Sequence, residues 1–304
     1  MNRELNRWYL VTFLAVLLAG VRAMAVPVDK PLIDVTHGGG TFVAAGFDGT
    51  VYSSVAGGPW EKRSTGLTNS LRTVSFGGGV FIAAGEGGAL IRSTNGVDWT
   101  VHSLPVTMGL PDSAWGDGRF VVMGNGSDAT WTVLTSTNGI DWVASRVEAA
   151  GFLRQDGTVE VARFGGVGYG NGRFLATGGS SGLNLTLTST DAIRWKEQPN
   201  DGIGNRGPVA FSGGKFATVG EYYIDDDDDD GGWVYTAPRI SEDGLFWLGT
   251  STYNIYTIAA IDCGFATAAV VDPALTRVQF IRGTQFWPVF QTPDVVDVPQ
   301  SVLA

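Results

Sequence analysis

Six consecutive aspartates at 225–230 form the densest group of potential ligands in the sequence. Within this run Asp226, Asp228 and Asp230 alternate and are followed by glycine, which matches the first part of a calcium-binding loop. Ca²⁺ prefers oxygen ligands at such spacing, but the twelfth position, where a bidentate Glu is usual, is Ala237. Two interpretations therefore stand: a Ca²⁺ site at these three aspartates, or a hydrated acidic loop whose like charges keep it extended. No other pattern in the chain requires a cofactor.

Four aromatic residues accompany the long connections of the chain. Tyr222, Tyr223 and Trp233 flank the acidic run, and Trp131 ends another insertion. Exposed rings near carboxylates are suited to stacking on sugars or to docking a protein. These four residues are therefore candidates for binding, and the alternative is that they cover their own loops.

Patterns for hydrolytic chemistry are weak. The two histidines, His37 and His102, have no Ser or Cys partner in a recognisable motif, which argues against a His-based triad or a His-rich zinc site. His37 occupies a slot that other units fill with Phe, Trp or Tyr, so packing is expected there. The lone cysteine, Cys263, cannot form an internal disulfide and is expected to be a buried thiol. No catalytic residue is predicted, and whether the protein is an enzyme stays open.

A Ser followed six residues later by Trp recurs along the chain, most clearly from Ser93 to Trp99. The Ser, Asn or Asp oxygens can accept backbone N–H groups, Gly permits positive φ, and Trp covers the hairpin. A nucleophile is needed once and not in each unit, so these residues are predicted to hold turns. They are Ser93, Asn95, Gly96 and Trp99; Ser136, Asn138, Gly139 and Trp142; Ser189, Asp191 and Trp195; and Ser241, Asp243, Gly244 and Trp247.

The units align on a Phe that opens an apolar run and returns after 39, 39, 54, 42 and 49 residues. Each unit has room for four short strands separated by glycine-rich turns. Four strands in about 40 to 50 residues are typical of a β-propeller blade. We therefore predict an all-β fold, a six-bladed β-propeller of four-stranded antiparallel blades, with seven blades as the alternative. The blades are expected at about 32–62, 71–103, 111–145, 164–198, 207–249 and 254–290, with a C-terminal tail at 291–304, all in one domain over 26–304.

The four strands of a unit are named A, B, C and D in chain order. The A–B and C–D turns keep their length, whereas insertions fall in the B–C and D–A connections, at 125–130, 143–163, 179–184 and 222–232. A meander brings its B–C and D–A connections to one end of the blade, so each blade has a fixed edge and a variable edge. Binding residues usually lie on loops held by a rigid scaffold, so a ligand is expected at the variable edge.

The units resemble the Asp-box repeats, also called BNR repeats, of sialidase-like β-propellers and many exported bacterial propeller proteins. The usual Ser-x-Asp-x-Gly-x-x-Trp box is one residue shorter here, as in Ser241 to Trp247. The resemblance implies a propeller and leaves the activity open, because one fold carries many functions. Membership of the sialidases would imply an arginine triad, a Tyr–Glu pair and an acid Asp. No motif in this sequence assigns any of these roles to particular residues. A triad is conceivable only among arginines of the D–A connections, which are Arg72, Arg154, Arg163 and Arg206.

Residues 1–25 have the features of a secretory signal peptide. Arg3 and Arg7 precede an apolar run of about 13 residues, and Ala23-Met24-Ala25 resembles a cleavage site. An uncleaved anchor is the alternative, but a membrane span needs about 20 apolar residues. The mature chain is expected to begin at Val26, to have no membrane span, and to be secreted, periplasmic or on the cell surface.

The chain is acidic, with a formal net charge of −10 that becomes −12 once the three Arg and one Glu of the signal are removed. Such a chain is repelled by phosphate backbones and anionic lipids, which argues against nucleic acid or a membrane surface as partner. The units also resemble those of the propeller assembly factor of photosystem II, for which an Arg-rich partner surface is expected. The charge argues against that comparison.

These observations favour an exported, non-catalytic β-propeller that binds a glycan or an extracellular protein through its variable B–C and D–A edge. A glycoside hydrolase or lyase distantly related to sialidases is one alternative. A structural surface repeat protein is another.

Overall fold

The computed structural model describes residues 30–125, 130–148, 151–153, 159–161, 163–180, 183–198, 204–205, 207–224, 233–249, 255–261, 264–272, 275–282 and 294–299. These residues divide into two compact units. The first unit holds the described residues up to Glu148 together with Asp191–Ile193, and the second holds the rest. In the described part of the chain, no helix has the length and apolar character needed to cross a membrane.

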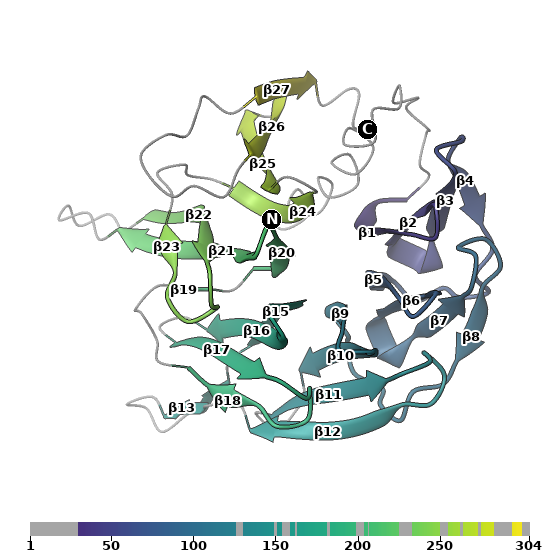
Figure 1. Ribbon diagram of the computed structural model, residues 1–304, viewed down its shortest axis with the longest axis horizontal. Helices are drawn as coiled ribbons and strands as arrows, with labels where there is room; N and C mark the ends of the chain where they lie inside the picture. The colour runs from purple at the N-terminus through teal and green to yellow at the C-terminus, as the bar shows by residue number, and fades with distance from the viewer. Residues whose placement is uncertain are drawn as a thin grey trace. The chain divides into compact units, whose positions relative to one another are not determined.

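The first unit contains three antiparallel four-stranded meanders, called blades 1, 2 and 3 (Figure 1). Blade 1 holds β1 (Leu32–Gly38), β2 (Thr41–Gly46), β3 (Val51–Val55) and β4 (Glu61–Arg63). Blade 2 holds β5 (Leu71–Gly77), β6 (Val80–Gly85), β7 (Leu90–Ser93) and β8 (Thr100–His102). Blade 3 holds β9 (Asp112–Gly116), β10 (Arg119–Asn125), β11 (Thr130–Ser136) and β12 (Val143–Glu148). Short 3-10 turns, η2 (Phe47–Gly49) and η3 (Glu86–Gly88), form the B–C connections of blades 1 and 2.

The second unit repeats the meander with more variation. A hairpin of β13 (Gly151–Leu153) and β14 (Val159–Val161) precedes blade 4, which holds β15 (Arg163–Gly170), β16 (Arg173–Ser180), β17 (Leu183–Ser189) and β18 (Lys196–Glu197). A five-stranded sheet follows, with β19 (Gly204–Asn205), β20 (Ala210–Ser212), β21 (Lys215–Ile224), β22 (Trp233–Ser241) and β23 (Leu248–Gly249). The last sheet holds β24 (Ile255–Ile261), β25 (Gly264–Asp272), β26 (Leu275–Arg282) and β27 (Asp294–Pro299).

The fold is thus an all-β propeller of four-stranded antiparallel blades, but the predicted number of blades is corrected. The described residues form five four-stranded sheets and not six, because the segment over 204–249 forms the five-stranded sheet. There the innermost strand is split into β19 and β20, which both pair with β21. Pro208 lies between the two pieces and has no N–H to donate to a ladder, which accounts for the break.

The outer strand of the last sheet also differs from the predicted boundary. β27 pairs with β26, as in Leu275↔Pro299 and Phe280↔Asp294. This strand lies in the segment 291–304 that was expected to form a tail.

The apolar core lies between neighbouring blades. The recurring Phe is fully buried at Phe120, Phe174 and Phe216. Between blades 2 and 3, Ile82 and Leu90 pack with residues of blade 3 in one cluster that includes Leu110, Phe120, Val122 and Leu134. In the short runs that begin at these Phe residues, consecutive residues are buried, as is typical of interior strands.

At three of the recurring Phe residues, the aromatic residue five positions earlier packs against the preceding blade. The Trp115 ring of blade 3 lies over Gly77 at the end of β5, where an added Cβ would come within 2.0 Å of the ring. On its other side, Trp115 contacts Phe120 with ring centroids 4.5 Å apart. Gly38 and Phe76 repeat this arrangement between blades 1 and 2. An aromatic ring and a glycine therefore form a recurring joint between blades.

The Ser-to-Trp segment of blade 2 is closed by side-chain to backbone hydrogen bonds. The Gly96 N–H donates to Ser93 Oγ at 2.9 Å. The N–H groups of Val97 and Asp98 both donate to Asn95 Oδ1 at 2.9 Å. Gly96 has a φ of 72°, which favours glycine. The side chains thus bind the backbone donors of a tight turn.

The same contacts recur in two other copies. Gly139 donates to Ser136 Oγ at 2.9 Å, and Gly244 donates to Ser241 Oγ at 2.8 Å. Desolvation raises the pKa of the Asp243 carboxyl, but hydrogen bonds from backbone N–H groups and from Ser241 outweigh it and lower that pKa.

Candidate functional site

A cleft of about 750 Å³ opens in the first unit, and blade 3 and the D–A connection that leads into it form its walls. Strand B of this blade ends at Asn125 and strand C begins at Thr130, so the cleft lies at the end of the blade where the variable connections run. Its lining residues are Pro105, Val106, Thr107, Met108, Gly109, Asn125, Thr132, Ala144, Ser145 and Arg146.

The cleft lies beside a row of small residues on blade 3. Gly124, Thr132 and Arg146 form one cross-strand row, since Thr132 pairs with both Gly124 and Arg146. Two residues closer to the fixed edge, the same face carries Val122 and Leu134, which are fully buried in the inter-blade core. At Gly124 the lack of a side chain lets the D–A connection pack against β10, and the neighbouring Thr132 lines the cleft.

The D–A connection is held in place by the preceding blade. The Met108 carbonyl accepts a hydrogen bond from Gly88 N–H at 2.8 Å, and Leu110 N–H donates to the Gly85 carbonyl at 3.1 Å. An added Cβ at Gly124 would come within 2.6 Å of the Gly109 carbonyl oxygen, so this segment lies directly on β10. The wall of the cleft is therefore fixed by backbone contacts, as expected of a preformed site.

The chemistry of the cleft is mixed and nearly neutral. Among the described residues that line it, Arg146 is the one charged side chain, and the set contains no aromatic ring and no carboxylate. Pro105, Val106 and Met108 supply apolar surface, and an unbranched thioether adapts to irregular partners. The other polar lining groups are hydroxyls, an amide and the backbone. This set can hold a ligand by shape and hydrogen bonding.

A second polar cluster lies on the innermost strands of blades 1 to 3. Asp34 on β1 accepts the N–H of Val35 at Oδ1, 2.8 Å away, and the N–H of Val74 on β5 at Oδ2, 2.7 Å away. Burial raises the pKa of the Asp34 carboxyl to about 6, against these two bonds and one from Thr73, which lower it. Oδ2 thus joins blade 1 to blade 2, while Oδ1 is held by the backbone of its own strand.

The cluster continues into blade 3 through hydroxyl groups. Thr73 Oγ1 lies 2.7 Å from Ser113 Oγ and 3.4 Å from Asp112 Oδ1. Ser113 also bonds the Ser75 hydroxyl. Asp34, Thr73 and Asp112 each lie eight residues before the recurring Phe of their blade. The arrangement links three inner strands, and the side chains that form it serve this linkage.

The raised pKa of Asp34 predicts a pH dependence of stability. Because the pKa in the folded state, about 6, exceeds the reference value of 3.8, folding favours the protonated carboxyl, and stability from this group is gained as the pH falls through 6 toward 4. Between pH 7 and pH 5 we expect the wild type to gain about 1.4 kcal/mol relative to Asp34→Asn. Urea unfolding of both proteins at each pH measures this difference. The contributions of the other carboxylates to the pH dependence are the same in both proteins and therefore cancel. A difference that does not change with pH would contradict the assignment.

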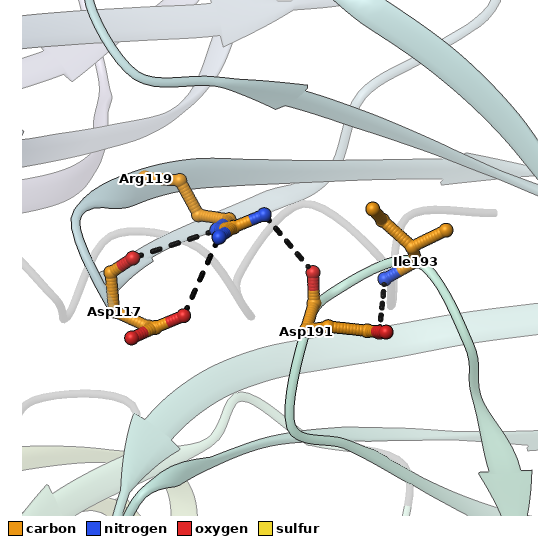
Figure 2. Close-up of polar contacts among 4 residues, drawn as sticks. All are labelled: Asp117, Arg119, Asp191 and Ile193. Carbon is orange, nitrogen blue, oxygen red and sulfur yellow. Dashed lines mark hydrogen bonds and ion pairs between the residues drawn. The ribbon is translucent and has the colours of Figure 1, made fainter.

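Two arginines of the A–B turns bind the next copy of the Ser-to-Trp segment. Arg119 Nη1 donates to the Asp191 carbonyl at 3.2 Å, while its Nη2 lies 3.4 Å from Asp117 Oδ2 (Figure 2). Arg173 Nη1 donates in the same way to the Asp243 carbonyl at 3.3 Å. These guanidinium groups stabilise the fixed edge.

The arginines and histidines considered for catalysis also have packing partners. Arg72 forms an ion pair with Glu86 and lies over the Phe47 ring, 5.5 Å from its centroid. The His37 ring contacts the Phe42 ring with centroids 4.3 Å apart, and His102 Nε2 lies 3.1 Å from Thr100 Oγ1. Arg154 and Arg206 lie outside the described residues.

The structure corrects the interpretation of Trp131 as an exposed binding residue. Its side chain is 0% exposed and lies within β11, paired with Asn125 and Val147. β10 and β11 stay paired as far as Asn125 and Trp131, so both strands reach into the region of the predicted insertion. Trp131 therefore packs in the protein, while its neighbour Thr132 lines the cleft.

The other predicted binding residues lie on strands β21 and β22. Tyr222 and Tyr223 are strand residues that pair with Tyr235 and Val234, and Trp233 pairs with Ile224. Asp226, Asp228 and Asp230 lie outside the described residues. In the described part of the chain, no group of three or more His, Cys, Asp or Glu side chains is arranged to hold a metal ion.

Sequence reasoning missed both the lining of the cleft and the polar cluster. The slot eight residues before the recurring Phe carries an oxygen-bearing side chain in each of blades 1 to 3, and this signal was available from the aligned units. The cleft had a weaker sequence signal, because blade 2 also has a glycine, Gly85, at the aligned position of Gly124. What distinguishes it is the pairing of Gly124 with Thr132, which requires knowledge of the register.

Comparison with protein-family models found no match, and comparison with curated proteins found none. Solved structures with a similar fold are β-propellers. The WD40 domain of Pan2 from Neurospora crassa gives a TM-score of 0.50 at 9% identity, over 82% of this chain and 75% of that one.

A structure described as YCF48 bound to D1 peptide gives a TM-score of 0.47 at 14% identity, over 83% and 90% of the two chains. The Cps50 (Swd1) β-propeller domain of Myceliophteria thermophila gives 0.46 at 11% identity, over 84% and 94%. At these identities the similarity concerns the fold alone.

Proposed function

We propose that this chain is a non-catalytic β-propeller that binds a segment of another protein in the cleft of blade 3. The cleft carries the proposal, because its volume of about 750 Å³ falls within the range typical of ligand sites and its wall is fixed by backbone hydrogen bonds. Apolar side chains at Pro105, Val106 and Met108 would take up side chains of the partner. The hydroxyls and the Asn125 amide would bind its backbone.

The lining favours a polypeptide over the other ligand classes. Sugar binding usually relies on stacking against aromatic rings, and glycoside hydrolysis usually needs two carboxylates. The described lining residues supply neither. The signal-like segment 1–25 supports export, so the partner would be an extracellular protein. The hydrogen-bonded Ser-to-Trp turns support placing the units among Asp-box-type repeats.

Selection of a phage-displayed library of random 12-residue peptides on the purified chain tests this function. We expect enriched peptides whose affinity falls at least tenfold on Ala144→Trp, because Ala144 is an exposed lining residue and a large ring there would fill the cleft. Isothermal titration calorimetry with synthetic copies of the peptides measures the change.

Val101→Trp is the matched control. Val101 is 53% exposed and occupies on β8 the position that Ala144 occupies on β12. Val101 pairs with Ile91 and Ala144 pairs with Leu134. Ile91 and Leu134 each lie two residues before the Ser of their Ser-to-Trp segment. Val101 does not line the cleft. Equal affinity of the peptides for wild type and Ala144→Trp, or an absence of enriched peptides together with binding to a sugar panel, would contradict the proposal.

A further inference from the structure

The fixed edge, where the A–B and C–D turns lie, exposes apolar side chains. Six large hydrophobic residues are well exposed in the described part of the chain, and four of them lie at C–D turns. These four are Val55, Ile140, Ile193 and Phe246. Hydrophobic residues that are exposed singly are normal on a protein surface, but their repetition at one edge points to an interaction surface.

The fifth position of the Ser-to-Trp segment is aliphatic in all four copies, as Val97, Ile140, Ile193 and Leu245. In each copy the backbone N–H at this position donates to the Oδ1 of the Asn or Asp two residues earlier, at 2.8 or 2.9 Å, and Figure 2 shows this bond for Ile193. The turn needs only the backbone there, and exposed turns usually carry polar residues. Ile140 is nevertheless 45% exposed and Ile193 is 55% exposed. The hydrogen bonds of the turn therefore do not account for these aliphatic side chains.

The turns follow one another along the first unit, because each contacts the preceding blade. An added Cβ at Gly96 would come within 2.8 Å of Thr41 Cγ2, so the turn of blade 2 packs on blade 1. The turn of blade 3 contacts blade 2, where Arg92 Nε donates to the Asn138 carbonyl at 2.9 Å. The turn of blade 4, which belongs to the first unit, is bound by Arg119 of blade 3. Successive turns thus carry one aliphatic residue each, and we call these residues the fixed-edge row: Val97, Ile140 and Ile193.

Two exposed carboxylates lie next to this row in the chain. Asp98 follows Val97 and Asp141 follows Ile140. Each carboxylate accepts a hydrogen bond of 2.9 Å from the side-chain amide of the Asn in its turn. That donor is neutral, and among the described residues no Lys or Arg forms an ion pair with either carboxylate. A carboxylate can accept several further hydrogen bonds. The row therefore combines apolar surface with uncompensated negative charge.

We propose that the fixed-edge row docks a partner protein through a segment that carries Lys or Arg together with apolar side chains. Burial of the aliphatic side chains would supply affinity, and cations paired with Asp98 and Asp141 would set the orientation. The formal charge of −10 favours a basic partner and disfavours a second copy of this chain. This surface lies at the fixed edge, whereas the cleft lies at the variable edge, so the inference goes beyond the proposed function.

Selection of a phage-displayed library of random 12-residue peptides on Ala144→Trp, in which the cleft is filled, tests this surface. We expect enriched peptides that contain Lys or Arg beside apolar residues. In the same background, Ile140→Ser should weaken their binding at least tenfold by isothermal titration calorimetry, while the turn survives because its hydrogen bond uses the Ile140 backbone. Val101→Ser is the matched control, because Val101 is 53% exposed and lies outside the Ser-to-Trp segment. Equal effects of the two variants would overturn the proposal.

Charge substitution tests the role of the carboxylates. We expect Asp141→Asn to weaken binding of the enriched peptides at least threefold, and by less at high salt than at low salt. A peptide with Glu in place of its cations should bind Asp141→Lys better than it binds the chain with Asp141. Glu197→Gln is the control, because it removes one exposed carboxylate on the outer strand β18. Enriched peptides without Lys or Arg, or an equal effect of both variants, would overturn the basic assignment.

The outcomes separate this inference from the proposed function. No enrichment on Ala144→Trp would refute the fixed-edge row and leave the cleft as a site. Peptides that bind wild type and Ala144→Trp equally and lose affinity on Ile140→Ser would support the fixed-edge row and refute the cleft. A dimer in sedimentation experiments that dissociates on Ile140→Ser would identify a second copy as the occupant and refute a basic partner.

Discussion

Replacing Gly77 with alanine is expected to lower the free energy of unfolding by about 3 kcal/mol or more. The new Cβ would lie 2.0 Å from the Trp115 ring, far inside van der Waals contact. The ring also makes an edge contact with the fully buried Phe120, so moving the ring away from the new Cβ would lose that packing. Overpacking of this kind usually costs about 1 to 3 kcal/mol, and a clash with a confined ring lies at the upper end.

Gly109→Ala is the matched control for this substitution. An added Cβ at Gly109 meets no atom within 4 Å, so we expect a change below about 0.5 kcal/mol. Urea unfolding followed by tryptophan fluorescence measures both variants, and near-ultraviolet circular dichroism reports the packing of the Trp115 ring. Similar midpoints for the two variants would show that the glycine and the ring do not form a joint between blades.

The same joint shows why the blade type could be predicted from the sequence. An aromatic residue followed by glycine occurs at 76–77, 115–116 and 169–170, each at a fixed distance before the recurring Phe. Signals of this kind are local, since each unit carries its own turn residues and its own apolar run. Repetition of a local signal predicts strands, turns and the antiparallel meander without knowledge of distant contacts.

The number of blades could not be predicted in the same way. Pro208 interrupts an inner strand, and β27, in the segment that was expected to be a tail, forms the outer strand of the last sheet. Both outcomes depend on which segments pair. The repeat predicts that a strand is present, whereas its pairing depends on available hydrogen-bond donors and on contacts between residues far apart in the chain.

The site shows a similar division between local and tertiary signals. The variable edge follows from the lengths of the connections, and the cleft lies at that edge of blade 3. Its shape comes from Gly124 lying opposite Thr132 and from a connection fixed by Gly85 and Gly88. These are contacts between residues far apart in the chain. A preference for aromatic residues as binding groups therefore selected Trp131, one residue from the lining and on the opposite face of its strand.

We expect Trp131→Ala to lower the free energy of unfolding by about 3 to 5 kcal/mol, because truncating a fully buried aromatic side chain loses its transfer free energy and leaves a cavity. Trp131→Phe keeps most of the apolar volume and should cost less than the alanine variant. Chemical unfolding of the purified variants gives the stabilities, and calorimetry with the selected peptides gives the affinities.

The two interpretations of Trp131 predict opposite pairs of results. A buried Trp131 predicts a large loss of stability in the alanine variant and, in Trp131→Phe, peptide affinity within about twofold of the wild type. A surface binding ring predicts unchanged stability and lost affinity in both variants. Phe246→Ala is the control for an exposed aromatic residue, because Phe246 is 78% exposed and should change stability by less than about 0.5 kcal/mol. If Trp131→Ala were as mild as Phe246→Ala, the extension of β11 that buries Trp131 and builds one wall of the cleft would be wrong.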